Sequence, residues 1–285
     1  MVVPFPPAGG ADTTARLFAA PFQTLLVENR PGAGGTIGAA EVARAAPDGT
    51  TLLLDAANQA VAPFVLKNIP FDYATAFTPI SRVTIYPLIL VVKPESPHRS
   101  LEALLARAKA EPGTLTYSSS GNAVSNHIAT VVLLRRAGAD MTHVPYRGGG
   151  PALQAVLAGD VDCGFATVAS AAALVQDGRL RALAASSAAR IPSLPAVPTV
   201  AEQGFAGYDQ VEWNGLYGPA GLPGPAVTRL FECCRAALAD ASVQGRLAGL
   251  GAIGLGTAPA EFDAWLKRER AAMAVVAREA NITAD

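Results

Sequence analysis

Short apolar runs alternate with helical patterns along most of the chain, and this alternation limits the possible folds more than any other feature. The runs are rich in β-branched residues and leucine, which predicts strands. They span 2–5, 24–28, 51–55, 80–92, 115–118, 142–144, 161–165 and 180–185. Strands interleaved with helices are typical of α/β proteins with largely parallel sheets. We therefore expect an α/β fold.

Apolar residues at helical spacing predict core-facing helices between these strands. One stripe is Ala15, Phe18, Phe22 and Leu25, and another is Leu101, Leu104, Leu105 and Ala108. Pro225 and Pro259 stand where a first helical turn would begin, ahead of further stripes. These stripes are Val227, Leu230, Cys234 and Leu238, and then Phe262, Leu266, Met273 and Val276. The C-terminal part is therefore expected to be mostly helical.

The length of 285 residues favours two lobes or one large α/β domain. Two stretches, 80–94 and 191–225, are interpreted as crossings between lobes, because each combines an extended or proline-rich run with a change of pattern. We therefore expect lobe one at 1–94 plus 216–285 and lobe two at 95–215.

Composition excludes several classes of function. The chain has 22 Lys+Arg against 23 Asp+Glu, so it has no basic face for nucleic acid. No apolar run reaches the roughly 18 residues of a membrane span, and we expect no membrane insertion. Cys163, Cys233 and Cys234 have neither metal-ligand spacing nor the pattern of a disulfide framework. We expect no metal.

Four glycine-rich or hydroxyl-rich loops each follow a predicted strand and open a helix, and they are the most informative feature. They span 6–12, 32–38, 118–125 and 146–151. A helix N-terminus presents unpaired N–H groups and partial positive charge, and glycine lets a ligand approach the backbone. Glycines also simply make tight turns, but four such loops in one chain favour a site for a carboxylate or phosphate.

The loop at 32–38 also permits a competing interpretation. Gly32, Gly34 and Gly38 follow a strand, and Asp55 ends the next strand, where a ribose-binding acid could stand in an NAD(P)-dependent oxidoreductase. The spacing from Gly34 to Gly38 is one residue too long for G-x-G-x-x-G, and Pro31 separates strand from loop. This nicotinamide-dependent enzyme is kept as the alternative.

Catalysis has little support in the residue pattern. Ser118 to Ser120, His127, His143 and Asp160 could form a serine hydrolase triad on paper, but no G-x-S-x-G elbow is present. His127 is expected to lie on a helix or at a lobe interface. We therefore expect no catalytic residue.

Two charged residues in the loops have open roles. Arg147, between Tyr146 and glycines, either grips a carboxylate or pairs with a neighbouring acid on the surface. Asp12 either caps its helix or contacts an amino group or water on a ligand.

Nine segments, in order, resemble the Bug family, the solute receptors of tripartite tricarboxylate transporters. They include VPFPPAGGAD at 3–12, ENRPGAGGTIG at 28–38, SSSGNAVSNH at 118–127 and HVPYRG at 143–148. The others lie at 46–52, 77–80, 180–184, 195–202 and 213–216. The resemblance covers nearly the whole chain.

This resemblance implies a type II periplasmic-binding-protein fold whose two lobes close over an organic acid or amino acid, without a cofactor. Family members hold the carboxylate largely through loop backbone groups and water. Carried over by position, the ligand-binding residues would be Pro7, Gly9, Asp12, Ser119, Gly121, Ser125, Tyr146, Arg147, Gly148 and, as a specificity position, Ala166.

The resemblance also implies a place in transport. We expect a periplasmic monomer whose leader has been removed and whose partners are a small carboxylate and the membrane permease subunits. A receptor that signals to a sensor protein fits the same residues and stays open.

Two departures from the family pattern matter. The chain starts within what looks like the family's first strand. In addition, Ala166 follows Phe165 where family members often carry an acid, so ligands that need an amino-group partner become less favoured.

Overall fold

The computed structural model describes residues 1–7, 10–20, 25–122 and 124–279. The chain divides into two compact units, each described here by itself. Unit 1 comprises Met1–Ile85, Trp213–Gly249 and the segment from Ile253 through the last helix. Unit 2 comprises Tyr86–Glu212 and Leu250–Ala252. Within the described residues, no helix has the length and apolar character needed to cross a membrane.

Unit 1 is built on a six-stranded sheet with the order β11-β4-β10-β3-β1-β2. Its strands are β1 (Val2–Val3), β2 (Glu28–Asn29), β3 (Leu53–Asp55), β4 (Phe77–Tyr86), β10 (Glu212–Pro219) and β11 (Ile253–Gly254). β1 runs parallel to β2 and β3, whereas β10 runs antiparallel to β3. Its helices are α1 (Gly10–Ala19), α2 (Thr36–Ala43), α3 (Asn58–Val65), α8 (Gly224–Ala239), α9 (Ala241–Gly249) and α10 (Pro259–Glu279), with a 3₁₀ turn η1 (Ala33–Gly35).

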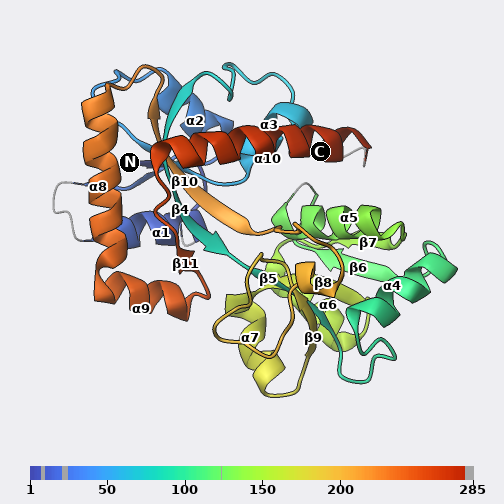
Figure 1. Cartoon of the computed structure of the whole chain (residues 1–285). Helices are drawn as coiled ribbons and strands as arrows, with labels where there is room; N and C mark the ends of the chain where they lie inside the picture. Colours follow the sequence, from blue (N-terminus) through green and yellow to red (C-terminus); the bar gives the residue numbers. More distant parts are fainter. Residues whose placement is uncertain (8–9, 21–24, 123, 280–285) are drawn as a thin grey trace. The chain divides into compact units, whose positions relative to one another are not determined.

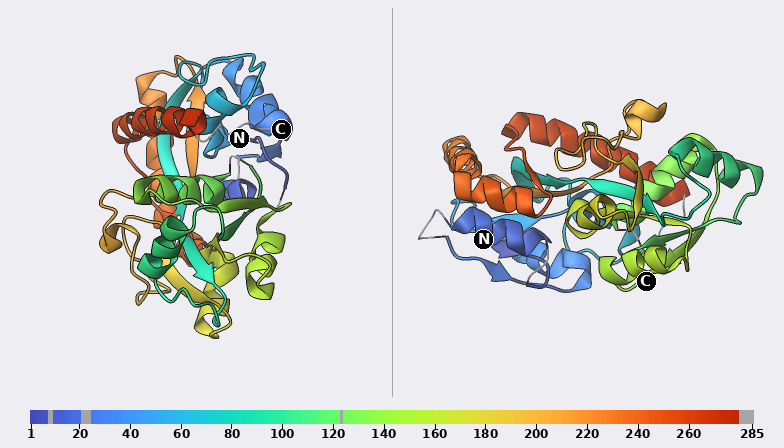
Figure 2. Two further views of the ribbon diagram at one scale, coloured as in Figure 1. Left: turned by 90° about the vertical axis from the view of Figure 1, so that its right-hand side faces the viewer. Right: turned by 90° about the horizontal axis from the view of Figure 1, so that it is seen from below.

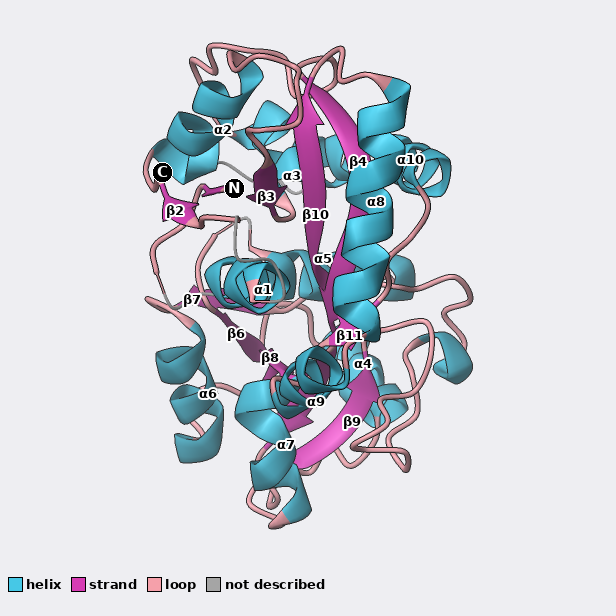
Figure 3. Ribbon diagram, turned by 90° about the vertical axis from the view of Figure 1, so that its left-hand side faces the viewer, coloured by secondary structure: helices cyan, strands magenta, loops and turns pink. Residues whose placement is uncertain are grey.

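Both faces of this sheet are covered. On one face α1 and α8 pack over the strands, with Phe18 and Cys234 in one cluster with Leu216 of β10 (Figure 3). On the other face α10 lies alongside α3 (Figure 1). There Trp213 packs edge-on against Trp265, and the Arg82 guanidinium lies 3.8 Å above the Trp265 ring.

Unit 2 is built on a five-stranded sheet with the order β7-β6-β8-β5-β9. Its strands are β5 (Leu88–Val92), β6 (Thr116–Ser119), β7 (Thr142–Pro145), β8 (Cys163–Thr167) and β9 (Arg181–Ala185). Its helices are α4 (Leu101–Ala110), α5 (Ser125–Ala137), α6 (Gly149–Ala158) and α7 (Val168–Gln176), with a 3₁₀ turn η2 (Ala201–Gln203). β6 is parallel to β7 and β8, whereas β5 is antiparallel to β8 and β9.

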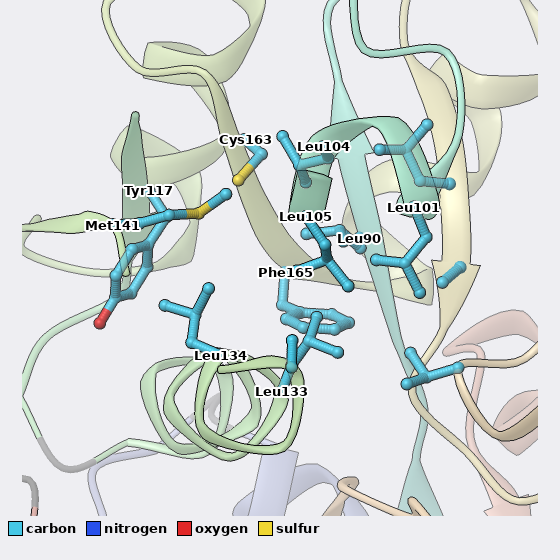
Figure 4. Packing of buried hydrophobic residues seen from close by; sticks show 14 of the residues in the cluster. Leu90, Leu101, Leu104, Leu105, Tyr117, Leu133, Leu134, Met141, Cys163 and Phe165 are labelled. Carbon is cyan, nitrogen blue, oxygen red and sulfur yellow. The ribbon is translucent and has the colours of Figure 1, made fainter. Parts of the chain in front are cut away.

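The unit 2 sheet separates two apolar layers, because alternate residues of each strand point to opposite faces. Leu90 and Phe165 pack with Leu104 of α4 and Leu133 of α5 (Figure 4). Residues of the opposite parity, such as Val91, pack with α6 and α7. The views in Figure 2 show α4 and α5, in green, and α6 and α7, in yellow-green, on different sides of this sheet.

Most predicted elements are confirmed, within a few residues at their ends. The stripe beginning at Leu101 is α4, and Pro225 and Pro259 do lie in the first turns of α8 and α10. α1 ends at Ala19, so its predicted continuation is wrong at Leu25, while Phe22 lies outside the described residues.

The expected α/β class is confirmed, but the expectation of largely parallel sheets is wrong for the strands at the crossings. The predicted strand at 80–92 is two strands, β4 and β5, which are separated at Pro87 because proline has no N–H for the ladder. β5 and β10 enter their sheets from the other unit instead of through a helix, and both run antiparallel. The crossings, after Ile85 and after Glu212, come before the predicted boundaries at 94/95 and 215/216.

The strand β10 lies in the stretch that the sequence analysis treated as a crossing. Its residues, EWNGLYGP, include two glycines and no β-branched residue, so the pattern does not predict a strand. Gly215 is required by packing, since a Cβ there would lie 2.5 Å from the Phe262 ring. The glycine therefore lets α10 approach the sheet.

Asp55 is a buried carboxyl at the end of β3. Its side chain is 0% exposed and accepts hydrogen bonds from Gln59 Nε2 at 2.8 Å and from the Ala56 N–H at 2.9 Å. Burial raises the pKa of Asp55 to about 6, and these hydrogen bonds only partly offset the rise. Unit 1 thus holds a carboxyl that takes up a proton at a higher pH than an exposed aspartate does.

We expect Asp55→Asn to remove a pH-dependent loss of stability. Between the ordinary pKa of 3.8 and the folded pKa of about 6, the folded chain binds more protons than the unfolded chain, so the free energy of unfolding falls as pH rises. A shift of this size corresponds to about 3 kcal/mol. In urea unfolding from pH 4 to 7, the free energy of unfolding of Asp55→Asn should rise relative to that of the wild type by roughly this amount. A difference between the two proteins that does not change with pH would contradict the prediction.

Candidate functional site

Three helices of unit 2 begin along one edge of its sheet. β7, β6 and β8 are neighbours and parallel, and they are followed by α6, α5 and α7 respectively. The carboxyl ends of parallel strands meet at the same edge, so the three helix N-termini gather there. We call this edge, with its three strand-to-helix loops, the unit 2 loop edge.

The helices at the unit 2 loop edge begin without side-chain caps. Val124, Gly148 and Thr167 precede α5, α6 and α7, and none of the three side chains accepts a hydrogen bond from the first helical turn. The first N–H groups of a helix have no intrahelical partner, and the helix dipole adds partial positive charge. Such an arrangement suits an anion.

The predicted site residues of lobe two all lie at this edge. They are Ser119, Gly121, Ser125, Tyr146, Arg147, Gly148 and Ala166. Arg147 is exposed and has no ion-pair partner among the described residues. These residues therefore do not form the surface ion pair that was the alternative role for Arg147. Their contact with a ligand remains a prediction.

Glycine is required at two of these positions. Gly121 has φ of 144° and Gly148 has φ of 110°, conformations that side chains rarely adopt. A Cβ on Gly148, Gly149 or Gly150 would meet no atom within 4 Å, so the start of α6 faces open space. A ligand can therefore approach this backbone.

Hydrogen bonds join the three loops to one another. The Tyr146 N–H donates to Ser119 O at 2.9 Å, and the Gly148 N–H donates to Ser120 O at 3.2 Å. Asn126 adds a second connection, because its Oδ1 accepts from Ser120 and its Nδ2 donates to Phe165 O at 3.2 Å. The sequence analysis missed Asn126, whose only signal is an amide in the first turn of a predicted helix.

A Ser–His pair fixes the loop after β6. The Ser119 Oγ lies 2.6 Å from His143 Nε2 and 2.7 Å from Gly121 O. A hydroxyl has one proton, so both contacts are satisfied when His143 Nε2–H donates to Oγ and Oγ–H donates to the Gly121 carbonyl. No acid bonded to His143 is present among the described residues, and Ser119 is 0% exposed, so the pair has the geometry of a loop support.

His143 belongs to an aromatic stack. Its ring stacks on His127 with centroids 4.0 Å apart and on Tyr117, its cross-strand partner, at 4.9 Å. Burial and the neighbouring His143 lower the pKa of His127 to about 4, and burial also lowers the pKa of His143. Both rings are therefore neutral near pH 7, and His127 is the helix histidine that the sequence predicted.

In unit 1, Asp12 is committed to neighbouring side chains. It is 2% exposed, and its Oδ1 accepts from Asn29 Nδ2 at 2.8 Å while Arg16 pairs with both carboxylate oxygens at 3.0 Å. Asn29 Nδ2 also donates to Phe5 O at 3.1 Å, so the network ties the loop after β1 to α1. Pro7 is exposed beside this network, and Gly9 lies outside the described residues.

The loop at 32–38 is explained by packing. A Cβ on Gly38 would lie 2.9 Å from Arg30 O and 3.0 Å from Pro4 Cα, so this glycine allows α2 to approach the strands. Asp55, the residue that the dinucleotide hypothesis assigned to ribose, is buried and bonded to Gln59. Gly38 is packed against the strands and Asp55 is buried, so neither residue is open to a dinucleotide as the oxidoreductase alternative requires.

The family follows from a comparison with known sequences. The sequence model of the tripartite tricarboxylate transporter family receptor, TctC, matches residues 14–253. The chain belongs to this family. The resemblance inferred from the nine segments is thereby confirmed.

Solved structures agree with this membership. The periplasmic binding protein BugD is 32% identical with a TM-score of 0.77, covering 99% of this chain and 97% of its own. Rpa4515 of R. palustris with adipate is 31% identical with a TM-score of 0.80, covering 99% and 97%. MatC (Rpa3494) of Rhodopseudomonas palustris with bound malate is 32% identical with a TM-score of 0.76, covering 96% and 97%. The periplasmic-binding-protein fold that we expected is confirmed, and the family is one of solute-binding proteins.

We expect the histidine stack to make stability depend on pH. The unfolded chain binds a proton near the ordinary pKa of 6.5, but folded His127 does so only near 4. The contribution of His127 to the free energy of unfolding is therefore complete above pH 6.5 and is lost as pH drops toward 4, a loss of about 3 kcal/mol.

The check is urea unfolding from pH 4.5 to 7.5 of His127→Phe, which keeps a ring but cannot titrate. Asp55 contributes a slope of opposite sign, so each variant is compared with the wild type. As pH falls from 7.5 to 4.5, His127→Phe should gain up to about 3 kcal/mol in free energy of unfolding relative to the wild type. His98→Phe, which replaces a histidine outside the stack, is the control and should follow the wild-type slope. Equal slopes in the wild type and His127→Phe would show that the ring does not resist protonation.

Proposed function

We propose that the chain is a periplasmic solute-binding protein that captures a small organic carboxylate and hands it unchanged to the permease subunits of a tripartite tricarboxylate transporter. The observation that carries this proposal is the unit 2 loop edge, with its three uncapped helix N-termini. Family membership supports it, since the family is one of transport receptors.

The ligand class follows from the chemistry of the loops. Backbone N–H groups, the hydroxyl of Ser125 and the Arg147 guanidinium are donors, which is what a carboxylate recruits. Two related structures contain the dicarboxylates adipate and malate. We infer a di- or tricarboxylate or an aromatic acid as the ligand, with Tyr146, Gly148 and Gly121 among its binding residues in unit 2.

Specificity is assigned to Ala166. It lies in β8 beside the start of α7, and its methyl group offers no acceptor for an amino group. We therefore infer that ligands without an amino group are preferred over amino acids.

A ligand screen tests the proposed function. Each candidate should raise the melting temperature if it binds the folded chain alone, and a ligand at 100 times its Kd adds about 2.7 kcal/mol. The set is malate, adipate, citrate, benzoate and aspartate, with NAD(H) and NADP(H) as the arm for the oxidoreductase alternative. Stabilisation by a nicotinamide dinucleotide and by no carboxylate would contradict the proposal.

Replacement of Gly148 tests the part played by the unit 2 loop edge. Gly148→Ala forces an alanine into a backbone conformation that favours glycine, and the start of α6 is displaced as a result. The variant should bind the carboxylate about tenfold or more weakly, a loss of ~1.4 kcal/mol in binding free energy. Calorimetric titration with a ligand from the screen measures the effect.

The matched control is Gly138→Ala. Gly138 also has a positive φ, of 62°, and also has open space around it, but it ends α5 instead of beginning a helix. The Gly138→Ala variant should lose about 1 kcal/mol of free energy of unfolding and should bind the carboxylate with wild-type affinity. Wild-type affinity in Gly148→Ala would remove α6 from the site.

A further inference from the structure

Unit 1 contains a hollow at the side of α1, next to the loop in which Pro7 is predicted to bind ligand. It has a volume of about 500 Å³ and is lined by Pro7, Asp12, Thr13, Arg16, Leu17 and Arg246. Arg246 comes from α9, which neighbours α1 (Figure 3). Small-molecule sites have volumes of about 300–1,000 Å³, so the hollow is large enough for a small organic anion.

The charges lining the hollow do not cancel. Asp12 and Arg16 neutralise each other through their two-point ion pair, and Asn29 accepts a further hydrogen bond from Arg16 and donates one to Asp12. Arg246 has no ion-pair or hydrogen-bond partner among the described residues, so one positive charge is left over. The hollow therefore favours an anion.

Thr13 supplies a second donor. It lies on α1 next to Asp12 and is half-buried, and its hydroxyl bonds to no other side chain or carbonyl in the part of the chain described. Arg246 is exposed on α9, and the backbone of this helix is anchored by Val243 and Leu247, which are 2% and 3% exposed. A guanidinium and a hydroxyl on two anchored helices are suitable donors for a carboxylate.

We propose that this hollow is an anion subsite in which the Arg246 guanidinium and the Thr13 hydroxyl hold one carboxylate group of the ligand. The inference rests on the proposed function, and it adds a residue that distinguishes ligands. Pro7 belongs both to the hollow and to the loop expected to hold ligand, so the subsite adjoins that loop. A dicarboxylate has a group for this subsite that a monocarboxylate of equal length lacks.

The test compares ligand pairs that differ in one carboxylate. Adipate is paired with hexanoate, and malate with 2-hydroxybutanoate, and each Kd is measured by calorimetric titration at low ionic strength, where partly exposed charges are least screened. Arg246→Gln should weaken both dicarboxylates by about tenfold or more, because a charged hydrogen bond is lost, and should change neither monocarboxylate more than about twofold.

The matched controls separate the subsite from a general charge effect. Arg229→Gln removes an exposed arginine on α8 that does not line the hollow, and should leave every Kd unchanged. Arg246→Lys keeps the charge and should retain part of the preference for dicarboxylates. Thr13→Val should weaken the dicarboxylates less than Arg246→Gln does.

The following outcomes would contradict the proposed subsite. Unchanged dicarboxylate affinity in Arg246→Gln, or an equal loss for both members of a pair, contradicts the role of Arg246 while the proposed function stands. Binding of monocarboxylates alone to the wild type also contradicts the subsite. Binding of no carboxylate to the wild type overturns the proposed function, and the subsite with it.

Discussion

The first N–H groups of a helix have no partner within the helix, and the site depends on this constraint more than on any side chain. In unit 2, three adjacent parallel strands place three such helix starts at one edge, and the side chains of Val124, Gly148 and Thr167, which precede the helices, do not cap them. Burying those N–H groups without a partner would be costly. The edge must therefore stay open to water or to an anion, and an organic carboxylate supplies both charge and acceptors.

Polar side chains near the loops mostly hold the backbone in place. Asp12 is bonded to Arg16 and Asn29, Ser119 to His143 and Gly121, and Asn126 to Ser120 and to Phe165 O of β8. The hydrogen-bonding groups of these side chains are already paired within the protein, so backbone groups are the main donors left for a ligand. In the proposed function, the backbone binds a carboxylate, and the exposed guanidinium groups of Arg147 and Arg246 distinguish the rest of the ligand.

The sequence predicted the elements that depend on local residue patterns. It did not predict the features that depend on packing between distant segments. Glycines and hydroxyls before helical stripes were enough to find the unit 2 loops, and Leu101 to Ala108 was enough to find α4. β10 was missed because Gly215 is set by the Phe262 ring, which lies far along the chain. The contacts of Asn126 and the pairing of Ser119 with His143 were also beyond reach, since each depends on strand register.

The account's central claim is that backbone N–H groups at helix starts bind the carboxylate. Its most direct test is an amide NMR titration of the ¹⁵N-labelled protein with malate and adipate. In unit 2, the largest shifts are expected on the amides of Ser125, Gly149 and Gly150. Saturable binding with these amides unmoved would contradict it.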